Sequence, residues 1–489
     1  MAVKNQVQLI TYPDSLGGDL RSLQQVLERH FPGVFKGGLH ILPPFPSSGD
    51  RGFAPLTYLE IDPRFGTWEH IRRIGEEYDL LLDLMVNHIS AHSTYFKDFL
   101  RLGRQSAYAD LFITVDKVWP DGNPPQEEVE KIFLRRKEPF SDFKIAATGE
   151  TVKVWTTFGK VTPSEQIDLD VHAPSTRRLL EDFLANFSRN HVSIVRLDAV
   201  GYVIKKRGTS CFFVEPEIYR FLDWITELAD SLGIVLLPEV HAHYSTQYRL
   251  AEHGYWIYDF ILPYRILETL INRSSVKLCE YLRARPSRQF TMLDCHDGVP
   301  IKPDLNDLYE GEGVRRLVET CLQRGANLSL IFSPKHRDAD GFDVHQIRGT
   351  YYSLLGDDDD AYLAARALQF FTPGVPQVYY VGLLAGENDQ AGVQASGEGR
   401  DINRHNFSLE EIEQAVEKEA VKRLVKLIRF RNEHEAFDGV FSVLESGADE
   451  IRLAWEKEGA RCALRVDLRD YRTEITYTDE RGDQVSYLV

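Results

Sequence analysis

Acidic, basic and histidine side chains stand at the ends of four short apolar runs in this sequence. The carboxylates are Asp83, Asp198, Glu239 and Asp297, and the accompanying polar groups are Asn87, His88, Arg196 and His296. Arg196 and Asp198 are two residues apart, so in a strand both side chains point to the same face. A single buried carboxylate is usually part of a salt bridge, but three that follow three strands of one sheet favour a common site.

Carboxylates in such an arrangement could cleave a glycosidic bond. Two carboxyl groups that flank the bond supply a nucleophile and a general acid. Arg196 would hold Asp198 ionised, as a nucleophile requires. Glu239 would have to hold a proton, which calls for a less polar environment that raises its pKa. Asp297, with His296 beside it, would bind sugar hydroxyls more strongly as the ring gains positive charge.

Metal coordination is the main alternative use of these groups, because histidines and carboxylates are also metal ligands. The sequence has no closely spaced ligand pair such as HExxH, and the groups lie on separate predicted strands. We therefore expect a site without a metal ion or another cofactor. A metal-dependent isomerase would instead lose its activity with a chelator. A barrel that only binds a ligand would not need all three carboxylates.

Eight short apolar runs, which alternate with amphipathic stretches, must position these groups. The strand candidates are Val7–Ile10, Leu39–Leu42, Leu80–Val86, Val192–Leu197, Ile234–Pro238, Trp256–Ile261, Phe290–Asp294 and Gln377–Val381. The helix candidates are Asp19–His30, Trp68–Tyr78, Ser175–Asn190, Pro216–Leu232 and Ala361–Phe371. Continuous apolar strands indicate a parallel sheet covered on both faces. Eight such units predict an α/β fold, a (β/α)8 barrel, with a doubly wound open sheet as the alternative.

Two long segments interrupt this alternation and indicate inserted subdomains beside the barrel mouth. The expected domains are a barrel of residues 1–88, 172–297 and 361–437, an inserted subdomain B of residues 89–171, a second subdomain B′ of residues 298–360, and a C-terminal domain of residues 438–489. Alternating runs such as Glu450–Trp455 predict antiparallel strands in the last domain. The acidic run Asp357–Asp360 is typical of a surface turn or a helix cap.

Composition excludes several classes of protein. The chain has 489 residues with 43% hydrophobic and 27% charged residues, as in an ordinary globular protein. A formal net charge of −17 argues against binding to nucleic acid or to an anionic membrane surface. Five scattered cysteines without a CxxC pair, and no signal-like or membrane-spanning run, predict a cytoplasmic protein. The sequence does not predict the oligomeric state.

The segments that hold these polar groups resemble, in order and in strand context, the signature segments of the α-amylase superfamily, glycoside hydrolase family 13. Further segments are similar to its sucrose phosphorylase branch. They are Ile41–Pro46, Gly208–Cys211, Pro238–His241, Asp294–Gly298, Phe371–Gly382 and Arg400–His405. The resemblance extends over nearly the whole chain. It departs from the pattern at Arg348-Gly349, which could alter the acceptor site.

The resemblance implies roles for particular residues. Asp198 would be the nucleophile, Glu239 the acid/base and Asp297 the transition-state stabiliser. The glucose subsite would be lined by Asp50, Phe53, His88, Arg196, His296 and Arg404. The polar loop Ser47–Phe53 can offer a carboxylate to a hydroxyl and a ring as a platform.

The resemblance also implies a sugar glucoside and inorganic phosphate as substrates. Phosphate must outcompete water for the glucosyl–enzyme ester, so cations are expected near Asp198. Phe133–Lys137 and Lys335–Arg337, followed by Gly341–Gln346, could supply them. Sucrose phosphorylases usually carry a tyrosine where this chain has His345. A histidine there, followed by Gln346, together with Arg135 and the loop Pro44–Phe53, resembles the sucrose 6-phosphate phosphorylases. This implies phosphorolysis of sucrose 6-phosphate, with sucrose, glucosylglycerol or glucosylglycerate as alternative donors and hydrolysis or transglycosylation as more remote alternatives.

Overall fold

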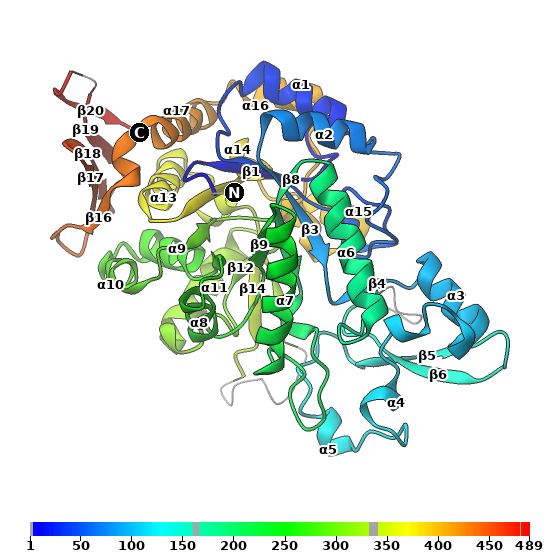
Figure 1. The fold of residues 1–489 in the computed structure, drawn as a ribbon. Coiled ribbons are helices and arrows are strands. Elements are labelled where there is room, and N and C mark those ends of the chain that lie inside the picture. Colours follow the sequence, from blue (N-terminus) through cyan, green and yellow to red (C-terminus); the bar gives the residue numbers. More distant parts are fainter. Residues whose placement is uncertain (1–2, 160–165, 332–340, 480) are drawn as a thin grey trace. The chain divides into compact units, whose positions relative to one another are not determined.

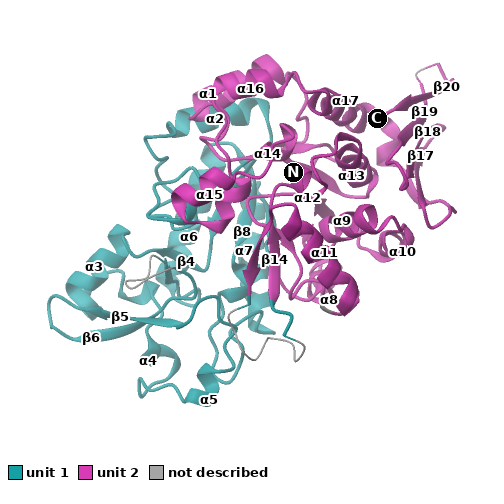
Figure 2. Cartoon of the chain, turned by 180° about the vertical axis from the view of Figure 1, so that it is seen from behind, with its two compact units in different colours: residues 1, 41–240, 331–343 teal, residues 2–40, 241–330, 344–489 magenta. Residues whose placement is uncertain are grey.

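The structure, a computed structural model, describes residues 3–159, 166–331, 341–479 and 481–489 (Figure 1). The chain divides into two compact units. Unit 1 consists of residues 1, 41–240 and 331–343, and unit 2 of residues 2–40, 241–330 and 344–489 (Figure 2). Among the helices of the described residues, none has the length and apolarity that crossing a lipid bilayer requires. The segment Lys335–Arg337 lies outside the described residues.

Eight strands form the central parallel sheet. They are β1 (Gln8–Thr11), β2 (Gly38–Ile41), β3 (Leu80–Met85), β8 (Val192–Asp198), β9 (Val235–Pro238), β10 (Ile257–Asp259), β11 (Gln289–Thr291) and β15 (Val375–Tyr379). Their order is β10-β11-β15-β1-β2-β3-β8-β9, so the strands follow the chain and β15 returns to β1. Strands that return to the first one, with helices between them, define a (β/α)8 barrel. The predicted fold class is confirmed.

The barrel strands of unit 1 position the first group of polar side chains. All of β3 is buried, and its register places Asp83 beside Arg196 and Met85 beside Asp198 of β8. The helices between these strands are α2 (Trp68–Glu77), α6 (Pro174–Arg189) and α7 (Glu217–Ser231). In α6 the buried residues Leu180, Phe183, Leu184 and Phe187 recur every three or four positions, which gives the helix one apolar face.

The long segment after β3 has small sheets and a core of its own within unit 1. Its elements are β4 (His88–Ser90), α3 (Thr94–Leu102), α4 (Val115–Val118), α5 (Gln126–Val129), β5 (Phe140–Lys144), β6 (Thr151–Trp155) and β7 (Gln166–Asp168). Strand β4 pairs with β7 and β5 with β6, both antiparallel. Phe96 packs edge-on against Phe112 and Phe143 in the core of this segment.

Unit 2 holds the helices that follow the other barrel strands. They are α1 (Leu20–His30), α8 (Tyr244–Glu252), α9 (Leu262–Asn272), α10 (Val276–Ala284), α13 (Asp359–Phe371), α14 (Tyr380–Leu383), α15 (Gln390–Ser396), α16 (Leu409–Ala415) and α17 (Glu419–Glu433). Asp358 caps α13, since its side chain accepts from the backbone N–H groups of Asp360 and Ala361. The acidic run is therefore a helix cap, one of its two predicted uses.

The second long segment, also in unit 2, forms a three-stranded antiparallel sheet in the order β12-β14-β13. Its elements are β12 (Val299–Pro300), α11 (Gly311–Gln323), β13 (Asn327–Leu330), β14 (Val344–Arg348) and α12 (Tyr351–Leu354). A Cβ at Gly298 would lie 2.3 Å from the backbone oxygen of Ile347. Glycine is therefore required at this position, because the loop after Asp297 passes directly against β14.

The chain ends in the predicted antiparallel sheet. Its strands are β16 (Val440–Val443), β17 (Glu450–Lys457), β18 (Ala460–Asp467), β19 (Thr473–Thr478) and β20 (Gln484–Leu488), each paired with the next. The indole N–H of Trp455 donates to the backbone oxygen of Phe371 at 2.7 Å. The sheet is thus tied to the end of α13. The domain boundaries inferred from the sequence stay predictions.

Two barrel strands are at least two residues shorter than expected, and β15 begins and ends two residues before the expected run Gln377–Val381. β10 ends at Asp259, although the apolar run continues through Ile261. The carboxylate of Asp259 accepts from the backbone N–H groups of Ile261 and Leu262, and so caps the start of α9. β11 likewise ends at Thr291, before the apolar residues Met292 and Leu293. Burial predicted strand for these residues, but at the end of β10 the cap by Asp259 turns the chain into α9.

Candidate functional site

In unit 1, Arg196 holds three carboxylates. Its Nη1 donates to Asp83 at 2.5 Å and to Asp198 at 2.8 Å, and its Nη2 lies 3.6 Å from an oxygen of Glu239. The other oxygen of Glu239 accepts from the backbone N–H of Ala199 at 3.1 Å. Ala199 has a left-handed φ of 54°, which turns the chain sharply after β8. The predicted clustering of Arg196, Asp198 and Glu239 is thus observed.

The protonation of Asp198 differs from the expectation that Arg196 keeps it fully ionised. Burial and the charges of Glu239 and Asp83 raise the pKa of Asp198 to about 7, against the lowering effect of Arg196. Like charges close together in a buried site favour the protonated form of a carboxyl group. Asp198 therefore titrates near neutral pH.

Phe53 and His88 lie together in unit 1. The guanidinium carbon of Arg196 lies 5.8 Å from the centre of the Phe53 ring. Nε2 of His88 donates to the backbone oxygen of Phe53 at 2.9 Å, and burial lowers the pKa of His88, so the ring is neutral. Its Nδ1 is buried and accepts no hydrogen bond from the described residues. A sugar hydroxyl could donate to this nitrogen.

The turn that holds Asp50 is strained but closely supported. Asp50 and Arg51 have φ values of 46° and 49°, a left-handed region that favours glycine. They form the short 3₁₀ helix η1 (Asp50–Gly52), in which a Cβ on Gly52 would lie 2.7 Å from the backbone oxygen of Pro43. The negative charge of Asp50 acts to raise the pKa of the His88 ring. The turn therefore holds a carboxylate beside His88.

A buried lysine that sequence reasoning missed joins the inserted segment to the barrel strands of unit 1. Lys205 Nζ lies 2.7 Å from a carboxylate oxygen of Asp168, 3.0 Å from the hydroxyl of Thr157 and 3.2 Å from the amide oxygen of Asn87. It also donates to the backbone oxygen of Tyr202. The sequence signal was a lysine directly after the apolar run Tyr202–Ile204. An ammonium group thus supplies positive charge next to Asn87.

The basic run 135–137 separates into three different environments. The guanidinium carbon of Arg135 lies 5.9 Å from the centre of the Phe158 ring, and that ring is 5.3 Å from the ring of His88. Arg136 is turned inward and donates to the hydroxyl of Thr156 at 3.2 Å. Lys137 is exposed. Arg135 is therefore the member of this run that lies nearest to the aromatic side chains around His88.

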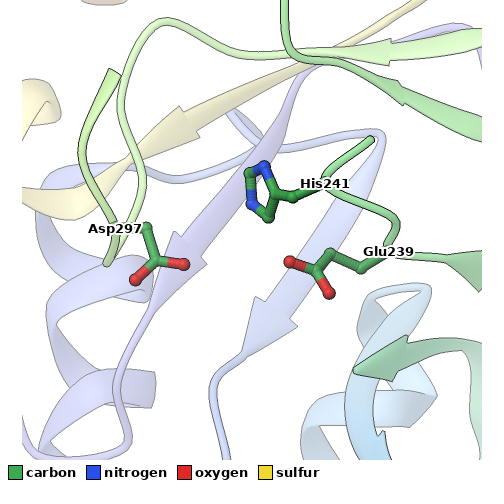
Figure 3. Close-up of side chains that lie close together, drawn as sticks. All are labelled: Glu239, His241 and Asp297. Atoms are coloured by element: carbon green, nitrogen blue, oxygen red, sulfur yellow. The ribbon is translucent and has the colours of Figure 1, made fainter. Parts of the chain in front are cut away.

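In unit 2, Asp297 has several positive groups near it, of which Figure 3 draws His241. Burial alone would raise its pKa, but these groups hold the pKa well below the usual range of an aspartate: Arg400, His296, Arg404 and His241. Nε of Arg400 lies 3.7 Å from Oδ1 of Asp297, and Nε2 of His296 lies 3.8 Å from Oδ2. Oδ1 is buried and accepts no hydrogen bond within the described residues. Asp297 is thus an ionised acceptor.

His241 is a second residue that sequence reasoning missed, although the resemblance had included its segment. Its Nδ1 lies 3.3 Å from the buried carboxylate of Asp304, and its ring stacks on Phe260 with centroids 4.1 Å apart. An atom of its ring lies within 4.8 Å of a carboxylate oxygen of Asp297. His241 therefore adds to the positive groups around that aspartate.

His345 and Gln346 lie on β14 and both are buried. Nδ1 of His345 donates to the backbone oxygen of Lys302, and its ring meets the ring of His241 edge-on with centroids 6.0 Å apart. Gln346 is opposite Pro300 of β12 in the sheet register. Unit 2 thus brings together Asp297, His296, Arg404 and His345 of the predicted residues. The departure at Arg348 also lies on β14, at its end.

The comparisons with known proteins agree with this fold. Residues 33–265 match the α-amylase catalytic domain. A sucrose 6(F)-phosphate phosphorylase of Thermoanaerobacterium thermosaccharolyticum is 62% identical over 489 residues, with 100% of both chains covered. A glucosylglycerol phosphorylase of Marinobacter adhaerens is 43% identical over 489 residues, again with 100% of both chains covered.

A solved structure extends the similarity to three dimensions. The crystal structure of sucrose 6F-phosphate phosphorylase from Thermoanaerobacter thermosaccharolyticum matches with a TM-score of 0.99 at 62% identity, covering 100% of this chain and 99% of the other. The chain therefore belongs to the α-amylase family and, within it, to the sucrose phosphorylase branch.

Proposed function

We propose that the protein is a retaining phosphorylase that converts sucrose 6-phosphate and phosphate into α-D-glucose 1-phosphate and fructose 6-phosphate. The observation that carries this proposal is the full-length identity of 62% to a sucrose 6(F)-phosphate phosphorylase. The carboxylate pair on Arg196 supports it, because the reaction needs a nucleophile and a proton donor and these two carboxyl groups lie on one guanidinium.

The first half-reaction transfers the glucosyl group to the enzyme. Glu239 gives its proton to the glycosidic oxygen while a carboxylate oxygen of Asp198 attacks the anomeric carbon. The bond between that carbon and the glycosidic oxygen breaks, fructose 6-phosphate leaves, and a β-glucosyl ester of Asp198 forms. Arg196, which donates to Asp198 at 2.8 Å, orients the attacking carboxylate.

The second half-reaction transfers the glucosyl group to phosphate. Glu239, now ionised, takes a proton from the incoming phosphate, whose oxygen attacks the anomeric carbon and releases Asp198. Two inversions leave the product in the α configuration. Phosphate is preferred over water only if the site binds the anion and excludes solvent, and the cations around the carboxylates serve this purpose.

The remaining site residues bind the glucosyl group in this proposal. Asp297 stabilises the positive charge of the oxocarbenium-like transition state, and its ionised state supports this role. Asp50, Phe53, His88, Arg196, His296 and Arg404 form the glucose subsite. His88 suits this role because its ring is neutral and its buried Nδ1 could accept a hydrogen bond from a sugar hydroxyl.

Acceptor recognition is assigned to Arg135 of unit 1 and His345 of unit 2, with Gln346 next to His345 on β14. A phosphomonoester carries close to two negative charges at neutral pH, which an arginine and a histidine can neutralise. Burial of His345, with Nδ1 held by the backbone of Lys302, supports a fixed orientation of its ring. Segments 89–171 and 298–360 act as the subdomains B and B′ that supply these residues. A cytoplasmic location fits substrates that are sugar phosphates.

Product analysis with and without phosphate tests the proposal. Sucrose 6-phosphate with inorganic phosphate should give α-D-glucose 1-phosphate in proton and phosphorus NMR spectra, and little product should form without phosphate. Release of free glucose at the same rate in both samples would identify a hydrolase. Formation of the β anomer would exclude a covalent intermediate on Asp198. If glucosylglycerol is the one donor turned over, the proposed donor is wrong and the activity is that of the 43% identical relative.

A further inference from the structure

The segment 399–407 of unit 2 holds the loop that carries Asp297. The side-chain amide of Asn403 donates to the backbone oxygens of Cys295 and Asp297 at 3.0 and 3.1 Å. Nε of Arg404 donates to the backbone oxygen of His296 at 2.9 Å. Arg400 contributes the charge nearest to the Asp297 carboxylate, at 3.7 Å. Three residues of this segment therefore set the position and the ionisation of Asp297.

The same segment is held at its far end by His405, which lies between two carboxylates. Nδ1 of His405 is 2.9 Å from Oδ2 of Asp389, and Nε2 is 3.1 Å from Oε1 of Glu411. Both carboxylates belong to helix starts: Asp389 accepts from the backbone of Gly392 in α15, and Glu411 from the backbone of Ser408 at the start of α16. His405 thus ties the segment to two helices.

Only the protonated ring can donate to both carboxylates, because a neutral imidazole has one N–H. The two carboxylates act to raise the pKa of His405 against the effect of its partial burial. Asp389 and Glu411 are the charged groups that face the ring, and Phe407 meets it edge-on with centroids 4.8 Å apart. The side-chain amide of the next residue, Asn406, donates to the carboxylate of Asp14 at 3.2 Å.

We infer that His405 is a positioning residue for Asp297: its protonated ring clamps the segment 399–407, and loss of that proton loosens the loop 295–298 and weakens donor binding. The inference rests on the proposed function for its kinetic part. Its structural part, the coupling between His405 and the loop 295–298, does not depend on any activity. Asn403 and Arg404 transmit the effect, since they make the hydrogen bonds to that loop.

Hydrogen exchange followed by mass spectrometry tests the structural part. At pH 6.5, His405→Gln should raise the exchange rate of amides in residues 295–298 and 399–407 by roughly three- to tenfold, the cost of losing a partly exposed charged contact. The matched control is His253→Gln in unit 2, whose ring contacts the backbone oxygen of Arg249. This control should leave both segments unchanged. Exchange that rises in neither segment, or equally throughout unit 2, would overturn the inference.

The kinetic part is tested by the pH dependence of KM for sucrose 6-phosphate. At pH 6.5 the KM of His405→Gln should exceed that of the unchanged enzyme by roughly three- to tenfold. The two values should converge as the pH rises, because His405 itself then loses its proton. A constant ratio at all pH values would show a merely structural role. If the unchanged enzyme phosphorolyses no donor, the proposed function is wrong. The exchange experiment still tests whether His405 holds the loop 295–298.

Discussion

At the scale of the residue, the central feature is one guanidinium shared by three carboxylates. Asp83, which is fully buried, accepts from the same Nη1 of Arg196 that donates to Asp198, so the charge of Arg196 is not available to Asp198 alone. Spacing in the sequence predicted that Arg196 and Asp198 share a face. It did not predict the raised pKa of Asp198, because that depends on burial and on Glu239, which is 41 residues later in the chain.

The raised pKa of Asp198 predicts a particular pH profile. With α-glucosyl fluoride, which needs little protonation to leave, kcat/KM should fall below about pH 7, because Asp198 must be ionised to attack. In Glu239→Gln this acidic limb should move to lower pH, since a charge that raises the pKa of Asp198 is gone. A pH–rate series on both enzymes measures the shift. An acidic limb at the same pH in both would contradict the effect of the Glu239 charge on the pKa of Asp198.

The role of Glu239 as the proton donor has its own test. Glu239→Gln should lower kcat/KM on sucrose 6-phosphate by roughly a hundred- to ten-thousandfold, the usual contribution of general acid catalysis. On α-glucosyl fluoride the loss should be much smaller. Initial rates on the two donors provide the comparison. Equal losses on both would assign the proton to another group.

Arg135 is expected to act on the phosphorylated acceptor. A charge-assisted hydrogen bond contributes roughly 1.5–3 kcal/mol, so Arg135→Ala should lower kcat/KM for sucrose 6-phosphate about tenfold to a hundredfold and affect sucrose less. Lys137→Ala, which removes an exposed cation two residues away, is the matched control. Inorganic phosphate must be varied independently of the donor. The same loss on both donors would instead assign Arg135 to inorganic phosphate.

At the scale of the element, Lys205 connects the inserted segment to the end of β3. Its ammonium compensates Asp168, whose carboxylate also accepts from the backbone N–H and the hydroxyl of Thr157. Lys205→Met should therefore destabilise the protein by about 3 kcal/mol, the cost of leaving a buried carboxylate without its cation. Urea unfolding followed by circular dichroism measures the change.

The neighbouring lysine provides the control for this experiment. Lys206 is half exposed and pairs with Glu217 at 2.6 Å. Because an exposed ion pair contributes little, Lys206→Met should change stability by less than about 1 kcal/mol. Equal effects of the two substitutions would mean that Lys205 has no special role in holding the segment.

Strands and helices of the barrel were predicted well because their apolar runs are continuous and their helices amphipathic. The exceptions are β10 and β11, which end early, and β15, which lies two residues before the expected run. At β10, capping rather than hydrophobicity decides the backbone. Asp259 shows the cause: one carboxylate serves two backbone N–H groups of the next helix. Contacts between residues distant in the chain, such as Lys205 with Asn87 or Asn403 with Cys295, have no local signal and require the structure.

At the scale of the whole molecule, the charge of the chain opposes its proposed substrates. With a formal net charge of −17, the protein repels sugar phosphates and inorganic phosphate at long range. Binding must therefore depend on cations held close to the reacting groups, such as Arg135 in unit 1 and Arg400 and Arg404 in unit 2. In the proposed reaction, recognition of the acceptor consequently depends on individual side chains rather than on the overall charge of the chain.

Initial phosphorolysis rates on sucrose 6-phosphate and on sucrose, measured side by side at one saturating phosphate concentration, test the central claim most directly. Two charge-assisted contacts to the 6-phosphate, each contributing roughly 1.5–3 kcal/mol, predict a kcat/KM at least about a hundredfold higher for sucrose 6-phosphate. α-D-Glucose 1-phosphate should be the product with both donors. Equal values, or a higher value for sucrose, would contradict the assignment of sucrose 6-phosphate as the donor.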